Sequence, residues 1–97
     1  RDEHTTTEGL RQLRSQIDEL DNQLMDLLAK RMRVCREIGT YKKEHNMTVL
    51  QATRYNEILE KRGAQASLCG MNPEFAAQVF EHIHEESVRQ QLDIVNQ

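Results

Sequence analysis

Two basic side chains are spaced to bind an anion from one face of a predicted helix. Arg31 occupies a position in an apolar helical seam, where an unpaired guanidinium is costly. Lys42 follows eleven residues later, which at about 100° per residue returns within roughly 20° of the same face. Either Arg31 extends to solvent or pairs with a core acid, or the two cations form an anion site inside a helical bundle.

Two neutral polar side chains on another predicted helix complement these cations. Ser87 and Gln91 are i, i+4 neighbours that continue an apolar stripe, so their hydrogen-bonding groups are expected to face inward. Alone, they could be a buried polar pair satisfied by the backbone. With Arg31, Lys42 and Arg54 at the head of a short helix, they outline a small, positively charged pocket. Such a pocket suits a compact polyanion such as a dicarboxylate.

The sequence shows no set of residues suited to metal binding, phosphate binding or covalent catalysis. His82 and His84 are two residues apart, which on a helix places them on different faces, and both are expected on the solvent-exposed surface. There is no Gly-rich phosphate loop and no nucleophile elbow. We therefore expect no metal, no cofactor and no covalent mechanism.

The elements that must position these residues are helical. From Leu10 to Tyr41, apolar residues recur at alternating steps of three and four, with Arg31 inside the series. Thr5 and Glu8 form a candidate capping box, so one long helix is predicted from about residue 7 to about residue 44. With one Pro and four Gly in 97 residues, the sequence has too few turn residues for a β-sandwich or barrel.

A loop and a short helix are predicted next. The segment from His45 to Thr53 has no helical period. Thr53 is a candidate N-cap of the short helix, and Gly63 is placed to end it. The apolar residues expected to be buried here are Met47, Val49 and Leu50 in the loop and Ile58 and Leu59 in the helix.

A third helix of medium length has the strongest start signal in the chain. After a second loop at residues 64–71, Asn72 offers a capping side chain, Pro73 suits the first helical position, and Glu74 is an acid in the first turn. The helix should run to about Val95. The predicted fold is all-α, with three helices that are long, short and medium.

The long helix is too long for a domain of this size. At 1.5 Å per residue it would span about 55 Å, whereas a compact chain of 97 residues has a diameter of about 33 Å. Its apolar seam therefore needs cover from a second copy of the chain, in a closed two-fold homodimer. Arg14 lies about 100° around the helix from Arg31, so it could reach the partner's site more easily than its own.

Charge and composition exclude several partners. The net charge is −3, with acids and bases interspersed, so the basic surface of a nucleic-acid binder is missing. No apolar run approaches the ~18 residues of a membrane span, so no membrane association is expected. Cys35 and Cys69 have no spacing that demands a disulfide, and we expect reduced thiols and a cytoplasmic location.

Together, these residues resemble the all-helical class of chorismate mutases. The resemblance runs from Leu10 to about Gln91 without a gap. It implies an intertwined homodimer of three-helix subunits, and a cofactor-free isomerase that rearranges chorismate to prephenate in aromatic amino acid biosynthesis. The matching stretches are L-R-S-Q-I-D-E-L-D at 13–21, L-L-A-K-R at 27–31, I-G-T-Y-K at 38–42 and E-E-S-V-R-Q-Q at 85–91.

The resemblance also implies a role for each candidate residue. Arg14 would be donated across the dimer to a substrate carboxylate, and Arg31 would hold a carboxylate from within the same subunit. Lys42 and Gln91 would be the catalytic donors to the ether oxygen. Further substrate-binding contacts would come from Arg54 and Ser87.

Two positions depart from the family pattern. Gln51 and Tyr55 stand where the family usually has acids that address the ring hydroxyl of the substrate. The run R-Y-N-E at 54–57 is similar to chorismate mutase domains fused to DAHP synthase. On that basis residues 1–8, which are Thr-rich and lack an initiator Met, are expected to be a linker remnant or flexible N-terminus, and residues 9–97 the mutase domain.

Two other functions share this sequence pattern. The first is an isochorismate-pyruvate lyase on the same fold, which would use nearly the same pocket. The second is a non-catalytic module for dimerisation or feedback sensing, attached to a larger shikimate-pathway enzyme. In the latter, Arg31 and Lys42 would matter only for stability or for inhibition by a ligand.

Overall fold

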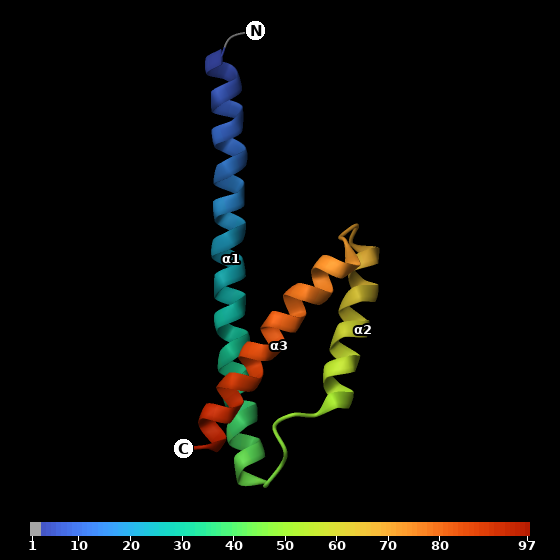
Figure 1. Cartoon of the computed structure of the whole chain (residues 1–97). Helices are drawn as coiled ribbons and strands as arrows, with labels where there is room; N and C mark the ends of the chain where they lie inside the picture. The colour runs from blue at the N-terminus through green and yellow to red at the C-terminus, as the bar shows by residue number, and fades with distance from the viewer. Residues whose placement is uncertain (1–2) are drawn as a thin grey trace. The chain divides into compact units, whose positions relative to one another are not determined.

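The described chain is built from α-helices (Figure 1). The computed structural model describes residues 3–97, with α1 at Glu3–Glu44, α2 at Ala52–Leu68 and α3 at Pro73–Val95. The all-α prediction of a long, a short and a medium helix is thereby confirmed. The chain divides into two compact units, Arg1–Arg31 and Met32–Gln97, and α1 contributes its last turns to the second of them.

α1 begins earlier than its capping signal predicts. The helix already includes Glu3, so Thr5 lies inside it, and the predicted start near residue 7 is wrong. The residues before the candidate cap include no Pro, and an acid in the first turn favours the helix N-terminus, so the helix extends past the capping box. Residues 1–2 lie outside the described part, and the assignment of residues 1–8 to a linker stays a prediction.

The apolar seam of the first unit is open to solvent in the single chain. Its six large aliphatic side chains are between 46% and 63% exposed. An amphipathic helix is stabilised mainly by burying its apolar face, so this seam calls for a partner surface. The residues are Leu10, Leu13, Ile17, Leu20, Leu24 and Leu27.

A residue in the left-handed backbone conformation caps the last turn of α1. Asn46 has φ 53°, and the N–H of Met47 donates to the carbonyl of Lys42 at 2.8 Å. The N–H of Asn46 donates to Lys43 O at 3.4 Å, which completes a Schellman arrangement. Asn tolerates this conformation better than most residues. The cap ends α1 at the predicted place and turns the chain back beside Lys42.

α2 differs from its prediction at both ends. Its N-cap is Gln51, which makes no side-chain capping bond, and Thr53 lies within the helix. The helix also continues through Gly63 to Leu68, because the following Ala-Gln-Ala segment favours helix and Ala66 is buried.

Gly70, rather than Gly63, marks the end of α2. Gly70 has φ 72°, and the N–H of Met71 donates to Ala66 O at 2.8 Å, again as a Schellman cap. The predicted loop of residues 64–71 therefore shrinks to the turn between α2 and α3. From this turn the two helices run in opposite directions and pack against each other (Figure 1).

α3 matches its prediction at both ends. The Asn72 side chain accepts a hydrogen bond from Glu74 N at 2.9 Å, and Pro73 occupies the first turn. Ala76 rather than the neighbouring Phe75 is buried. In the loop after α1, Val49 is buried, whereas the predicted burial of Met47 and Leu50 is wrong for the single chain. Ile58 is buried as predicted and Leu59 is half-buried.

Gly39 lets the end of α1 approach α3 closely. A Cβ at this position would lie 3.0 Å from the Cα of Gln91 and 3.2 Å from the Cβ of Ile94. Only glycine fits this spacing without movement of a helix. The close approach brings Lys42, three residues further along α1, within reach of Gln91.

No helix within residues 3–97 is long and apolar enough to cross a membrane. Cys35 is buried, Cys69 is exposed, and the two do not form a disulfide with each other. The cytoplasmic location stays a prediction.

Candidate functional site

The second unit contains a polar centre around Lys42. The Nζ atom of Lys42 donates to Gln91 Oε1 at 2.8 Å and to the backbone oxygen of Val49 at 2.9 Å. Gln91 lies 49 residues away on α3, whereas Val49 lies in the loop that the Asn46 cap turns back. The ammonium group is thus held from two sides in a partly buried position.

Burial perturbs the ammonium group of Lys42. Loss of solvent around the half-buried side chain lowers the pKa of Lys42, and the nearby Cys35 thiol partly opposes this effect. Cys35, Gly39 and Lys42 are spaced i, i+4 and i+7, so they share one face of α1. A cation in such a position interacts strongly with any negative charge that develops beside it.

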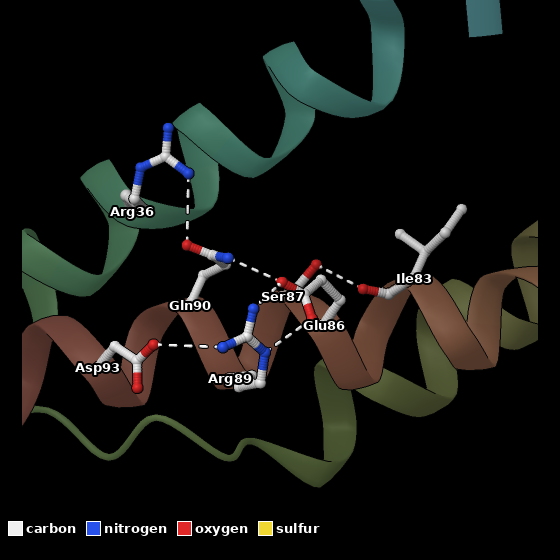
Figure 2. Close-up of polar contacts among 7 residues, drawn as sticks. All are labelled: Arg36, Ile83, Glu86, Ser87, Arg89, Gln90 and Asp93. Carbon is white, nitrogen blue, oxygen red and sulfur yellow. Dashed lines mark hydrogen bonds and ion pairs between the residues drawn. The ribbon is translucent and has the colours of Figure 1, made fainter. Parts of the chain in front are cut away.

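The two inward-facing polar residues of α3 are buried as predicted. Gln91 is 7% exposed and Ser87 is 4% exposed. Because Oε1 of Gln91 accepts from Lys42, its amide nitrogen is the end that can donate to a ligand. Ser87 donates through Oγ to the carbonyl of Ile83 at 2.8 Å, one turn earlier on α3 (Figure 2). The sequence had allowed for this kind of contact, in which the backbone satisfies a buried Ser87 hydroxyl.

Arg54 is not joined to this centre by any contact among the described residues. It lies in the first turn of α2, where its guanidinium is 3.8 Å from a carboxylate oxygen of Glu57. Both side chains are more than half exposed. An exposed ion pair of this kind contributes little, about 0–1 kcal/mol, so it leaves Arg54 able to turn toward a ligand.

The other two predicted arginines belong to the first unit. Arg14 is exposed on α1 and borders a surface hollow that also contains Leu10 of the apolar seam and Asp18. Arg31 is half-buried at the end of this unit. The structure therefore brings together Lys42, Gln91 and Val49, and leaves the grouping of the arginines with them as a prediction.

A second polar network links α1 to α3 (Figure 2). Arg36 of α1 donates to Gln90 Oε1 at 3.3 Å, and Gln90 donates to Glu86 Oε2 at 2.7 Å. Arg89 binds the same carboxylate through two nitrogens, at 2.6 and 2.8 Å, and contacts Asp93 at 3.5 Å. These hydrogen bonds lower the pKa of Glu86 to about 2, those from Arg89 most strongly.

We expect the Glu86 network to stabilise the protein above about pH 4.5 and to be lost in acid. A carboxylate whose pKa is lowered in the folded state contributes stability above its unfolded pKa, and this contribution disappears as the pH falls through about 2. Chemical denaturation should therefore show Glu86→Gln less stable than wild type at pH 6, with the gap closing toward pH 2. Glu60→Gln, at an exposed position of α2, is the control. A gap that stays constant with pH would contradict the assignment.

Three contributors to this region were not predicted. Val49 acts through its backbone carbonyl, which has no side-chain signal. Gly39 had a signal, because a glycine inside a helix interior usually has a packing reason. His84 was expected on the open surface, but it is half-buried, and its ring is tilted against that of Tyr55, with centroids 4.5 Å apart. His82 is exposed as predicted, and its Nδ1 atom lies 3.6 Å from Oε2 of Glu85.

The chain is similar in sequence and in fold to several known proteins. The solved structure of a conserved hypothetical protein from Pyrococcus furiosus superposes with a TM-score of 0.71 and 36% identity, covering 86% of this chain and 95% of that one. The T-protein of Enterobacter agglomerans is 32% identical over 81 residues, 84% of this chain and 22% of that protein. A 4-amino-4-deoxychorismate mutase of Streptomyces pristinaespiralis is 29% identical over 83 residues, 86% of this chain and 64% of that protein.

The family match covers both sides of the polar centre. The chain spans only about a fifth of the two T-proteins it matches, 22% and 21% of their length. The sequence profile described as Chorismate mutase type II matches residues 13–92, which include Lys42, Val49 and Gln91. With three helices in its described residues and with this match over most of its length, the chain belongs to the chorismate mutase type II family.

Proposed function

We propose that this domain rearranges chorismate to prephenate, with Lys42 and Gln91 as its catalytic residues. The observation that carries the proposal is the 2.8 Å hydrogen bond from Lys42 Nζ to Gln91 Oε1 in a partly buried position. It places an ammonium group and an amide N–H₂ side by side, where both can donate to one ligand oxygen. The membership of the chain in the chorismate mutase type II family supports the same assignment.

The reaction requires positioning and charge rather than a nucleophile. One C–O bond breaks while one C–C bond forms within a single molecule, and negative charge develops on the ether oxygen. The Lys42 ammonium stabilises that charge, and the Gln91 amide donates a second hydrogen bond. Because Lys42 is held by Val49 and Gln91 before the substrate arrives, little reorganisation is needed in the transition state.

Four further residues are proposed to bind the substrate carboxylates. Ser87 lies one turn from Gln91 on the same face of α3, and its hydroxyl would donate to a carboxylate oxygen in place of the Ile83 carbonyl. Arg54 would exchange its exposed contact with Glu57 for a carboxylate. The remaining two cations would be Arg31 from the same chain and Arg14 from a partner chain.

The proposed active unit is a homodimer. Its support is the exposed apolar seam of the first unit, which a second copy would cover. Arg14 borders a hollow that includes Leu10 of this seam, so covering the seam with a partner would bring Arg14 to that partner. Each site would then need residues from both chains.

Mixed dimers test the donation of Arg14. In a dimer of Arg14→Ala with Lys42→Ala, one site keeps both residues if Arg14 acts across the interface, whereas neither site does if it acts within its own chain. Random equal mixing gives half heterodimers, so we expect about a quarter of wild-type activity. The measurement is activity after co-refolding the two inactive variants. Activity no higher than that of the separate variants would exclude donation across the dimer.

The pH dependence of turnover should report on Lys42. Only the ammonium form can stabilise the ether oxygen, and burial lowers the pKa of Lys42. Turnover should therefore fall as the pH rises through a value below that of an exposed lysine, which is about 10.4. The check is kcat measured from pH 6 to 10 under substrate saturation. A rate that rises throughout this range would rule out the ammonium as a required donor.

The proposed function is tested by incubating the protein with chorismate and following its disappearance by ultraviolet absorbance, with the product identified chromatographically. Prephenate is the expected product. In a parallel incubation with isochorismate, release of salicylate and pyruvate would instead indicate a lyase. Binding of chorismate without turnover would indicate a sensing module. We further propose that the domain is fused to DAHP synthase, and the R-Y-N-E run at 54–57 is the feature that supports this.

A further inference from the structure

A hollow of about 430 Å³ lies between the start of α2 and the middle of α3. Its volume is within the range of sites for small molecules, roughly 300–1,000 Å³. Neither the Lys42 contacts nor the Glu86 network uses its lining. The lining residues are Leu50, Gln51, Ala52, Tyr55, Glu81, His84 and Glu85.

The α3 wall of this hollow continues into the Lys42 centre. His84, Ser87 and Gln91 are spaced i, i+3 and i+7, so they form one stripe along α3. At 1.5 Å per residue, His84 lies roughly 10 Å along the helix axis from Gln91. One small ring-shaped ligand can therefore span the two positions.

The opposite wall continues into the same centre. Val49, whose carbonyl holds Lys42, is followed directly by Leu50 and Gln51, both of which line the hollow. The loop after α1 thus contacts the catalytic lysine with one residue and borders the hollow with the next two. From these neighbouring residues on both walls, we infer that the hollow is the far end of the proposed substrate site.

The far end is lined by an aromatic pair that can bind a neutral polar group. The rings of Tyr55 and His84 are tilted by 38° with centroids 4.5 Å apart, and both residues are half-buried. A phenol and a neutral imidazole can each donate and accept hydrogen bonds, as can the amide of Gln51. This combination matches a hydroxyl group, which does both. Two carboxylates, those of Glu81 and Glu85, also line the hollow. The Oε2 atom of Glu85 lies 3.6 Å from Nδ1 of His82.

We propose that His84, positioned by its contact with Tyr55, is a specificity-determining residue that binds the hydroxyl group on the ring of the substrate. The inference rests on the proposed function, because it places the reacting ether at Lys42 and Gln91 and the ring hydroxyl at the hollow. His84 then selects substrates by their ring substituent and takes no part in breaking the C–O bond.

The test compares chorismate with an analogue in which the ring hydroxyl is replaced by hydrogen and the reacting ether is kept. Wild type should prefer chorismate by at least about tenfold in kcat/KM, because a hydrogen-bonding site left unpaired penalises the analogue. His84→Phe keeps a ring against Tyr55 but removes the nitrogens. It should bring the preference below about threefold, mainly by lowering kcat/KM for chorismate. His84→Leu should lower the preference for chorismate in the same way. The test therefore needs only one of the two variants to fold.

His82→Leu is the matched control, since it removes an exposed histidine from the same helix and should leave the preference unchanged. A loss of kcat/KM that is equal for both substrates in the His84 variants would show a packing role and overturn the inference, as would a preference that does not change. Wild type that forms no prephenate would instead refute the proposed function. The two failures are therefore distinguishable.

Discussion

Lys42→Ala is expected to lower turnover of chorismate by about 10²–10³-fold while the helical fold is retained. Removing a preorganised donor to a developing oxyanion typically costs this much in rate. The side chain is only half-buried, and its truncation makes room for water to reach the two buried acceptors, Gln91 Oε1 and Val49 O, so the fold should survive its loss. The measurement is kcat, together with far-ultraviolet circular dichroism.

Lys43→Ala is the matched control for this experiment. Lys43 is the next residue on α1, is exposed, and donates to the backbone oxygen of Gln97 rather than to the polar centre. Its removal should leave turnover unchanged. If Lys42→Ala retained near-normal turnover, the catalytic role of Lys42 would be wrong, and the Lys42–Gln91 pair would be only a structural contact.

Gly39→Ala is expected to reduce turnover by about tenfold and to destabilise the protein. The added Cβ would lie 3.0 Å from the backbone of Gln91, so α1 and α3 must separate by some tenths of an ångström. Overpacking of this kind typically costs about 1–3 kcal/mol, which exceeds the gain of about 1 kcal/mol in helix propensity. Since a misplacement of about 1 Å can cost 10²-fold in rate, a smaller shift should cost about tenfold.

Gly63→Ala separates the packing effect from helix propensity. Gly63 is also inside a helix, but a Cβ there meets nothing within 4 Å. This variant should be more stable than wild type by about 0.5–1 kcal/mol, with unchanged turnover. The two variants are compared by denaturant unfolding and by kcat. If Gly39→Ala behaved like Gly63→Ala, the close approach of α1 to α3 would not position the active centre.

The fold could be predicted where start and stop signals are unambiguous. α3 has a capping Asn72, a Pro at its first position and an acid in its first turn, and its bounds were predicted correctly. α2 has two glycines near its end, and the sequence does not show which one adopts a left-handed conformation. The choice of Gly63 was wrong because helix formers follow it, whereas Gly70 precedes Met71, whose N–H closes the cap.

The candidate site could be predicted from helix faces but not from the loop. The inward placement of Ser87 and Gln91 followed from their i, i+4 spacing on an apolar stripe. The backbone carbonyl of Val49 could not be predicted, because any residue type carries the same group. The spacing of His84 relative to His82 showed that they lie on different faces, but not that α2 presents Tyr55 to one of them.

The hydrogen bond between Lys42 and Gln91 has a consequence for the order of folding. It joins residues 49 positions apart, whereas the α2–α3 hairpin is closed by a turn of a few residues. Contacts between distant residues require a larger loss of chain entropy and form later than local ones. During refolding, helical content should therefore return before the Lys42–Gln91 pair does, and a chain can be fully helical without yet being competent for catalysis.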